Sequence, residues 1–138
     1  MRNLMIVSLI VAGAISCRDS GTQSDRTFSI GTAAVSYVVS EPIAVILANR
    51  SNRVINVATC CMTNPDLRLQ HEVDADWTPP GSCELRCASY PLLIGLEDQL
   101  IDTIAVSQPG RYRLMLRFGR GSVSAMDDSV FSNEFDVR

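Results

Sequence analysis

The chain has 138 residues, of which 46% are apolar and 20% charged, and this size predicts one globular domain rather than two. Fifteen acidic residues outnumber the 12 basic ones, which are all arginines, so the formal net charge is -3. This balance gives no reason to expect a nucleic-acid partner.

The N-terminal segment has the three parts of an export signal. Arg2 supplies positive charge, the residues from Leu4 to Val11 form an apolar run, and small residues lead to Cys17. An apolar run of this length is too short for a membrane-spanning helix, which needs about 20 residues. We therefore expect the segment to be removed. There are two alternatives to a lipid-anchored protein. One is ordinary secretion with a free Cys17, and the other is a segment that is not cleaved and stays as an anchor.

The residues Ala14-Ile15-Ser16-Cys17 resemble the bacterial lipobox. The resemblance implies that residues 1–16 are a lipoprotein signal peptide and that Cys17 becomes the first residue of the mature protein, carrying acyl chains such as palmitate. Arg18 rather than an aspartate follows the cysteine. By resemblance to the enterobacterial sorting rule, this implies a cell-envelope protein anchored at the outer membrane, on its periplasmic face or at the cell surface.

Between the lipobox and the first apolar segment, residues 18–27 include no apolar side chain. Such a segment cannot bury surface and predicts a solvated tether. We expect residues 17–27 to form the lipidated cysteine and tether, and residues 28–138 to form the domain.

From Phe28 onward, short apolar segments recur at the spacing of an all-β domain, with Gly, Pro, Asn and Asp between them and no helical stripe. This pattern predicts seven or eight strands. The candidates are Phe28 to Ile30 with Ala34 to Val39, Ile43 to Asn49, Arg53 to Cys61, Leu67 to Trp77, Glu84 to Ala88, Leu100 to Val106, Arg111 to Phe118, and Val130 to Val137.

Two of these segments have distinctive patterns. Ile43 to Leu47 is apolar on both faces, which predicts a central strand covered by the core on one side and by a loop on the other. Leu67 to Trp77 alternates over its whole length, which predicts one long strand with Leu69, His71 and Trp77 on its apolar face and an acidic polar face. The pattern favours Trp77 in the core over a role in surface recognition.

The most organised stretch runs from Gln108 to Phe118, where a Pro-Gly turn leads directly into strict alternation. Tyr112 and Leu114 lie on the predicted core face. The predicted solvent face consists of Arg111, Arg113, Met115 and Arg117. This pattern resembles the E–F corner of an immunoglobulin-like sandwich, which implies that the Tyr112 hydroxyl bonds to backbone a few residues upstream.

In the last predicted strand, Phe131 and Phe135 share one face with Val137. If this strand pairs with the Tyr112 strand, Glu134 and Asp136 are expected to lie near Arg113 and Arg117. The two arginines are then predicted to be a paired, solvated face rather than an anion site. The residues expected to form these ion pairs are therefore Glu134, Asp136, Arg113 and Arg117.

Together these features resemble the small immunoglobulin-like domains of bacterial lipoproteins and secreted proteins. The resemblance covers about Phe28 to Arg138 and rests on the run Ile43 to Ser51, Trp77, Pro109 to Leu114, and Ser132 to Phe135. It implies an all-β, immunoglobulin-like sandwich of seven or eight antiparallel strands. The usual inter-sheet cysteine pair is absent, since Leu114 stands where its second member is expected.

Four cysteines follow Cys17, and an even number in an exported domain favours disulfides. They are Cys60, Cys61, Cys83 and Cys87. Pairing of 60/61 with 83/87 is favoured over an adjacent Cys60–Cys61 bridge, which would close a strained ring. Each favoured bridge closes a loop of about 20 residues, worth roughly 3 kcal/mol. The alternative is a zinc site that uses three of these cysteines with His71.

Other candidate residues favour structural interpretations. His71 is the only histidine, and no Ser–His or Cys–His partner motif accompanies it. Asp74 and Asp76 lack the spacing of a calcium loop, Asp127-Asp128 is typical of a turn, and Gly119-Arg120-Gly121 precedes no helix. We therefore expect no catalytic residues, metal site, cofactor or evident small-molecule substrate.

Two functions fit this sequence. The first is a non-enzymatic, membrane-anchored envelope lipoprotein that acts as a binding or structural module with a protein partner, or as an accessory subunit of a surface complex. The second is an exported protease inhibitor, because the Asn-x-Ser turn, Trp77 and the Pro-Gly-x-Tyr pattern also resemble a bacterial proteinase-inhibitor family with the same kind of sandwich.

Overall fold

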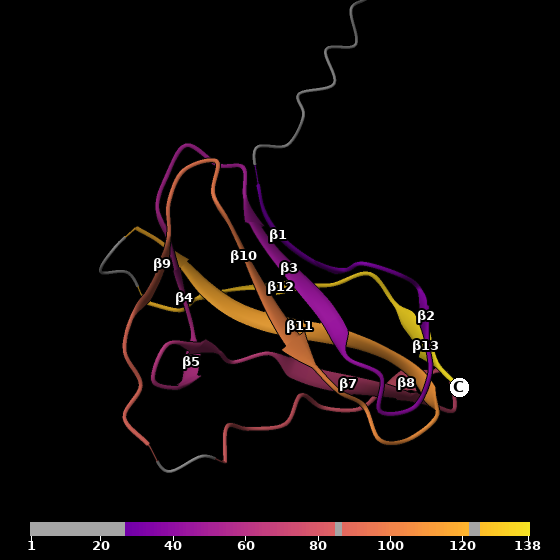
Figure 1. Ribbon diagram of the computed structural model, residues 1–138. Coiled ribbons are helices and arrows are strands. Elements are labelled where there is room, and N and C mark those ends of the chain that lie inside the picture. The colour runs from indigo at the N-terminus through magenta and orange to yellow at the C-terminus, as the bar shows by residue number, and fades with distance from the viewer. Residues whose placement is uncertain (1–26, 85–86, 122–124) are drawn as a thin grey trace, which may run out of the picture.

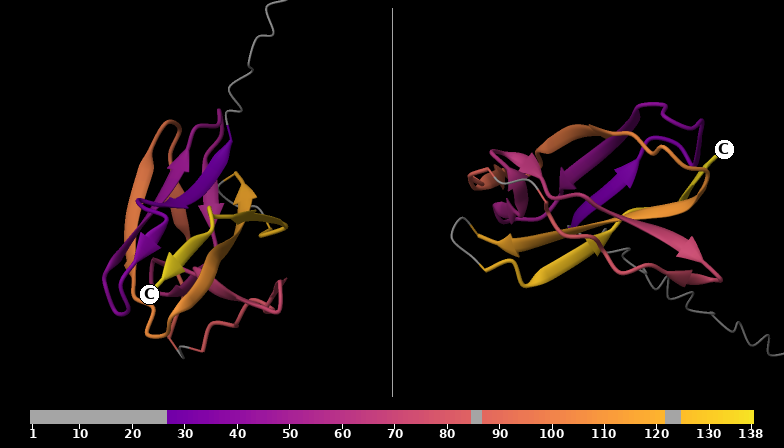
Figure 2. Two further views of the ribbon diagram at one scale, coloured as in Figure 1. Left: turned by 90° about the vertical axis from the view of Figure 1, so that its right-hand side faces the viewer. Right: turned by 90° about the horizontal axis from the view of Figure 1, so that it is seen from below.

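Residues 27–84, 87–121 and 125–138 are described by the structure, which is a computed structural model. The predicted signal peptide, Cys17 and the tether up to residue 26 lie outside them. Two layers of β-strands face each other, and the described residues contain no helix (Figure 1, Figure 2). Over this part of the chain, accordingly, no helix has the length and apolar character needed to cross a membrane.

The smaller layer is a three-stranded antiparallel sheet in the order β1 (Phe28–Thr32), β3 (Ile43–Asn49) and β10 (Gln99–Ile104). β3 is its central strand, as its apolar sequence predicts. Its outer face is not covered by a loop as expected, because Ile46 remains partly accessible and its neighbour on β10, Ile101, is 60% exposed.

The larger layer is built around β11 (Gly110–Arg120), the strand predicted from the Pro-Gly-x-Tyr pattern. Its principal order is β2, β13, β11, β4 and β9, with β12 and β7 also pairing with β11 and β8 pairing with β7. The bounds are β2 (Ser36–Tyr37), β4 (Ile55–Val57), β7 (Arg68–Val73), β8 (Asp76–Trp77), β9 (Leu92–Ile94), β12 (Asp128–Phe131) and β13 (Phe135–Val137).

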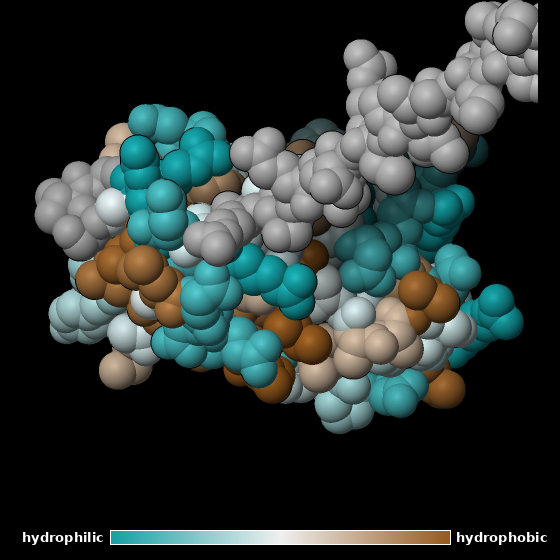
Figure 3. Space-filling model, turned by 90° about the horizontal axis from the view of Figure 1, so that it is seen from above, coloured by the Kyte–Doolittle hydropathy of each residue, from teal (hydrophilic) through white to brown (hydrophobic). Residues whose placement is uncertain are grey.

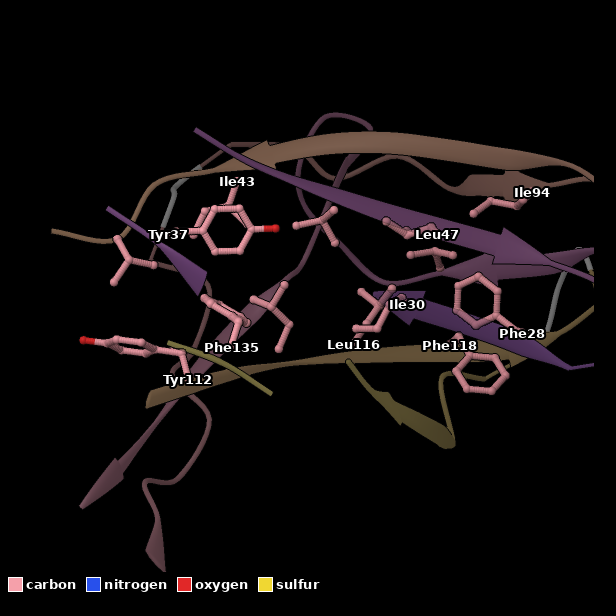
Figure 4. Packing of buried hydrophobic residues seen from close by; sticks show 14 of the residues in the cluster. Phe28, Ile30, Tyr37, Ile43, Leu47, Ile94, Tyr112, Leu116, Phe118 and Phe135 are labelled. Carbon is pink, nitrogen blue, oxygen red and sulfur yellow. The ribbon is translucent and has the colours of Figure 1, made fainter. Parts of the chain in front are cut away.

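The two inner faces enclose one core (Figure 4). Its fully buried side chains come mainly from β3, β4 and β11, with Phe135 added from β13. Phe28 packs on Phe118 at one end, with ring centroids 5.0 Å apart, and Tyr37 packs edge-on to Phe135 at the other. The protein is therefore an all-β, immunoglobulin-like sandwich, as its alternating strands predict.

Asn49, at the end of β3, is a buried polar residue that pins one end of this core. Its Nδ2 donates to the carbonyls of Arg53, Ile94 and Gly95 at 2.8–3.0 Å, and its Oδ1 accepts from Ser51. This side chain of β3 thus satisfies backbone groups of β9 and of the adjacent loops, and so links the two sheets at this end.

The predicted strand from Arg53 to Cys61 is divided, because the chain leaves the larger sheet near Ala58. β4 pairs with the C-terminal part of β11 and β7 with its N-terminal part, so both occupy one strand position. Between them, β5 (Thr59–Cys61) and β6 (Asn64–Pro65) form a two-stranded hairpin outside the sandwich. Backbone bonds from Ala58 to Arg117 and from Asp66 to Ala58 close its base.

The predicted long strand from Leu67 to Trp77 is wrong in its second half. The chain turns at Asp74 and Ala75, whose φ values of 52° and 67° are those of a two-residue hairpin turn, and β8 runs back along β7. Trp77 therefore lies on the outer face of the larger sheet and is only half-buried, rather than in the core.

The last predicted strand is interrupted by a bulge. β12 pairs Met115 with Phe131, whereas β13 pairs Tyr112 with Phe135, so one extra residue stands between the two registers. Because side-chain direction alternates, the extra residue sends Phe131 outward, where it is 46% exposed, while Phe135 points inward at 1%. The expectation that both share one face is wrong.

One predicted strand is replaced by another. Within Glu84 to Ala88, the described residues Glu84, Cys87 and Ala88 lie outside any strand. The chain instead forms β9 a few residues later, where it pairs with β4. The sequence pattern does not predict β9, which the apolar run Leu92–Ile94 forms.

Candidate functional site

The four cysteines form two parallel links between the β5–β6 hairpin and the segment after β8. Cys60 bonds to Cys83 and Cys61 to Cys87, with Cα–Cα distances of 5.4 Å in both. We call residues 59–66, 79–84 and 87–90 the stapled lobe. It lies at the lower end of the molecule in Figure 1, away from the start of β1.

The tip of the stapled lobe is held rigidly and exposes apolar side chains. Met62 has a φ of 53° and is 60% exposed, while its backbone bonds to Ala88 O at 2.7 Å and accepts from Tyr90 N at 2.8 Å. Tyr90 itself is 55% exposed. The two disulfides and these backbone bonds fix the tip.

Beside the lobe, the sandwich is open. Leu69 on β7 has the same side-chain direction as Leu114, its partner on β11, yet Leu69 is 36% exposed while Leu114 is 0%. The difference arises because the three-stranded sheet covers β11 but stops at β10, short of β7. The inner face of β7 is therefore left partly uncovered.

This opening is a groove of about 500 Å³ between the lobe, β7 and β10. Apolar side chains of Leu67, Leu69 and Ile104 line it, together with Gly81 and the Cys60–Cys83 bridge. A second depression of about 260 Å³ continues past Leu69 to His71 and Tyr112. We call the first depression, which the lobe walls, the edge groove.

The charged side chains of the edge groove are mostly acidic. Of its described lining residues, Asp66, Glu84 and Asp102 are carboxylates and Arg68 is a guanidinium. Asp66 is 8% exposed and already pairs with Arg68 at 2.7 Å. Asp102 Oδ1 accepts a hydrogen bond from Thr103 N at 2.8 Å. Among the described residues, no arginine forms an ion pair with Glu84 or Asp102.

At the far side of the second depression, Tyr112 occupies the corner position expected from the sequence. Its ring lies at one end of the core (Figure 4), and its hydroxyl donates to Gln108 O at 3.0 Å, in the connection that leads into β11. Its ring is 4% exposed, and burial raises the pKa of the hydroxyl. The tyrosine therefore ties the turn to the core.

The His71 ring stacks on the Tyr112 ring, with ring centroids 4.7 Å apart. Gly110 makes this possible, because a Cβ built there would overlap His71 Nε2 and the residue has a φ of 153°. The histidine is thus a packing element of the corner. The described residues place no serine or cysteine nucleophile against its ring nitrogens.

On the outer face of β11, Arg113 lies between two aromatic rings. Its guanidinium carbon is 4.4 Å from the ring centroids of both Trp77 and Phe131, and its Nε donates to Gln70 Oε1 at 2.8 Å. Gln70 is buried to 5% exposure and Met115 to 8%. The predicted solvent face is therefore covered here by β8 and β12.

The predicted ion pairs are assigned to the wrong arginines. Arg111, not Arg113 or Arg117, pairs with Glu134 and, at 3.5 Å, with Glu72. Arg117 donates instead to Met126 O. The bulge after β12 explains the shift, because it places Asp136 opposite Arg111 in the ladder. The Glu134 carboxylate raises the pKa of Arg111.

The remaining candidates have ordinary surroundings. Asp74 forms the β7–β8 turn with its neighbour, and Asp128 pairs with Arg120 at 2.9 Å. No group of three or more His, Cys, Asp or Glu side chains within 27–84, 87–121 and 125–138 could hold a metal ion. Cys17, the predicted lipid attachment site, lies outside the described residues.

The opposite end of the molecule has a different distribution of apolar residues over its visible, described part (Figure 3). Where it is visible beside the grey atoms, its apolar residues form separate patches among hydrophilic ones (Figure 3). The edge groove, with its apolar floor and the adjoining lobe, is therefore the candidate site among the described residues.

No protein-family model matches the chain, and no curated protein matches it. Three solved structures are similar in part. The crystal structure of the CARDB domain of the PF1109 protein from Pyrococcus furiosus, in complex with di-metal ions, is 10% identical, with 81% of this chain and 86% of that chain covered and a TM-score of 0.38.

The solution structure of the same CARDB domain is 11% identical, with 80% of this chain and 92% of that chain covered and a TM-score of 0.36. The ASH / PapD-like domain 7 of human CEP192 is 10% identical, with 98% and 94% covered and a TM-score of 0.33. At these identities and TM-scores the similarities support no conclusion about function.

Proposed function

We propose that this protein is a non-enzymatic binding module, anchored to the cell envelope by lipid on Cys17, which binds a protein partner in the edge groove. The observation that carries the proposal is the exposure of Leu69 on the inner face of a sandwich strand. An apolar surface that faces a protein core but is left open is a place where another chain can complete the packing.

The stapled lobe supports this function because it makes one wall of the groove rigid. The Cys60–Cys83 bridge lines the groove directly, and Cys61–Cys87 holds the same hairpin a residue away. A wall that is already fixed loses little conformational entropy on binding, so more of the contact energy contributes to affinity.

The position of the groove also suits an anchored protein. Phe28, where the folded domain begins, lies at the upper end in Figure 1, whereas the lobe and β7 lie at the lower end. An anchor that precedes Phe28 would join the domain at the end opposite the edge groove and would leave the groove accessible. Two or three acyl chains on Cys17 would hold the protein firmly, whereas one chain binds only marginally.

The test compares two substitutions in the full-length protein, purified with its partners from detergent-solubilised envelopes. Leu69→Glu places a charge on the groove floor. Leu93→Glu is the matched control, because Leu93 is 48% exposed and lies on β9 outside the groove. We expect a stoichiometric partner that is retained by wild type and Leu93→Glu and lost with Leu69→Glu.

Retention of that partner by Leu69→Glu would overturn the groove as its binding site. Inhibition of any member of a protease panel by the purified protein would favour the protease inhibitor instead. Mass spectrometry tests the anchor separately: an unmodified Cys17 in the mature protein would contradict it, and Cys17→Ser is expected to release the protein or leave it unprocessed.

A further inference from the structure

β10 forms the open rim of the edge groove and has a free side. Within the described residues it pairs with β3 alone. In an antiparallel pair, alternate residues direct their N–H and C=O groups away from the partner strand. On β10, the residues whose main-chain groups point away from β3 are Gln99, Ile101 and Thr103. Accordingly, the N–H of Gln99 bonds to the Asp98 side chain and that of Thr103 to the Asp102 side chain, and neither bonds to β3.

The free side of β10 borders the part of β7 that the smaller sheet fails to cover. Neighbouring strands lie about 4.8 Å apart and packed sheets about 10 Å apart. A fourth strand beside β10 would therefore extend the smaller sheet over Leu67 and Leu69, whose side chains line the groove. The N–H of Ile101, the outward carbonyls of β10 and the apolar floor are then available to the same occupant, while the N–H groups of Gln99 and Thr103 keep their side-chain partners.

Asp102 sets the condition on that occupant. In the pairing with β3 it stands opposite Val45, which is fully buried, so its side chain points toward the inner face between Leu100 and Ile104. An inward-pointing charge on an edge strand opposes pairing with ordinary apolar strands. A strand that brings a positive charge to this position would instead form an ion pair at the groove wall.

We propose that the edge groove binds an extended segment of the partner protein, which adds to β10 as a fourth strand, places an arginine or lysine against Asp102 and packs apolar side chains on Leu69. This inference rests on the proposed function and names the chemistry of its partner. The surplus of carboxylates among the described lining residues supports a cationic segment.

A second copy of this chain fits the rim less well. If β10 of another copy were to pair with this edge, it would bring its own Asp98 and Asp102 beside the same carboxylates. Like charges directly across a strand pair are destabilising. The pattern on β10 therefore discriminates against self-pairing and in favour of a basic strand.

The probe is the peptide Thr-Val-Thr-Arg-Thr-Val-Thr, in which valine and arginine share one face. Calorimetry with the full-length protein in detergent is expected to show binding of this peptide. Replacing its arginine with glutamate is expected to weaken binding at least tenfold, and so is Asp102→Asn in the protein. Asp98→Asn is the matched control, because it removes the charge from an equivalent capping side chain outside the groove.

A charge exchange makes the test independent of any folding defect. The Asp102→Arg protein is expected to prefer the glutamate peptide. Amide hydrogen exchange should slow at Ile101, the N–H between the two capped ones, when the arginine peptide binds wild type. Equal affinity for both peptides, no binding of either, unchanged affinity in Asp102→Asn, or dimers of wild type that exclude the peptide would each overturn the inference.

These outcomes are distinct from those of the partner purification. If Leu69→Glu loses its partner but the peptides do not bind as expected, the groove remains the binding site and strand addition is wrong. If Leu69→Glu keeps its partner, the proposed function itself is wrong.

Discussion

The sandwich and the stapled lobe of this protein are held together in different ways. In the sandwich, side chains such as Leu47 and Leu114 have no solvent exposure and pack between two sheets. In the lobe, Met62 and Tyr90 are more than half exposed, and two disulfides and a few backbone bonds supply the order. The comparison shows that apolar exposure is tolerated where covalent links replace burial.

The largest effect on stability is expected in the sandwich. Leu114→Ala should lower the free energy of unfolding by about 2 to 5 kcal/mol, because it opens a cavity where the side chain is fully buried. Denaturant unfolding with the disulfides intact measures this. Leu93→Ala is the exposed control and should cost less than about 0.5 kcal/mol; equal losses would contradict the position of the core.

The lobe should respond to loss of a crosslink. Replacing Cys60 and Cys83 with serine should cost less than the roughly 3 kcal/mol of a lone bridge, because Cys61–Cys87 still closes nearly the same loop. Amide hydrogen exchange should become faster at Met62 and Tyr90, whereas Leu116 in the sandwich should stay protected. If Leu116 exchanges as fast as Met62, the lobe and the sandwich unfold as one unit and the distinction between them is wrong.

A substitution at Met115 tests the contact between the two regions. The segment that leads from the lobe through β7 and β8 covers the outer face of β11, on which Met115 lies. Met115→Gln should cost about 1 to 3 kcal/mol, since a residue with 8% exposure would acquire an amide without a partner. The sequence predicts a loss below about 0.5 kcal/mol for a solvated position. Denaturant unfolding decides between the two values.

Tyr112→Phe should cost about 1 kcal/mol through the lost bond to Gln108 O. It should also change the pH dependence of stability. Burial raises the pKa of Tyr112, so the unfolded chain loses this proton first as the pH rises above about 10, and the protein is destabilised there. Unfolding curves from pH 8 to 11 should show this loss in wild type and a smaller one in the variant.

The smallest effect is expected at the surface pair. Arg111 and Glu134 have side-chain exposures of 52% and 44%, so Arg111→Gln should change stability by no more than about 1 kcal/mol. Any loss should shrink as salt is added, because exposed pairs are screened. A loss as large as that of Leu114→Ala would show that this pair supports the sheet.

Local alternation was enough to predict much of the sandwich. The Tyr112 strand and the apolar Ile43 to Leu47 strand lie at the centres of their sheets, because side-chain direction has a period of two and only one fold class buries such strands face to face. Along Tyr112 to Phe118, the predicted inner face is the observed one.

The errors arose at single residues that change the period. One extra residue between β12 and β13 reverses the faces of Phe131 and Phe135, and the turn at Asp74 and Ala75 folds Trp77 back over Arg113. The residue types at the bulge and at the turn do not indicate such a change, because the backbone geometry there depends on pairing with strands distant in the chain.

The candidate site could not be predicted in the same way. The sequence alone determined that the chain alternates as an all-β sandwich and that its cysteines occur in two clusters suited to bridging. Only the tertiary structure decided that β10 ends the smaller sheet before it covers Leu69, because the width of a sheet is set by which strands pair and not by the pattern within any one of them.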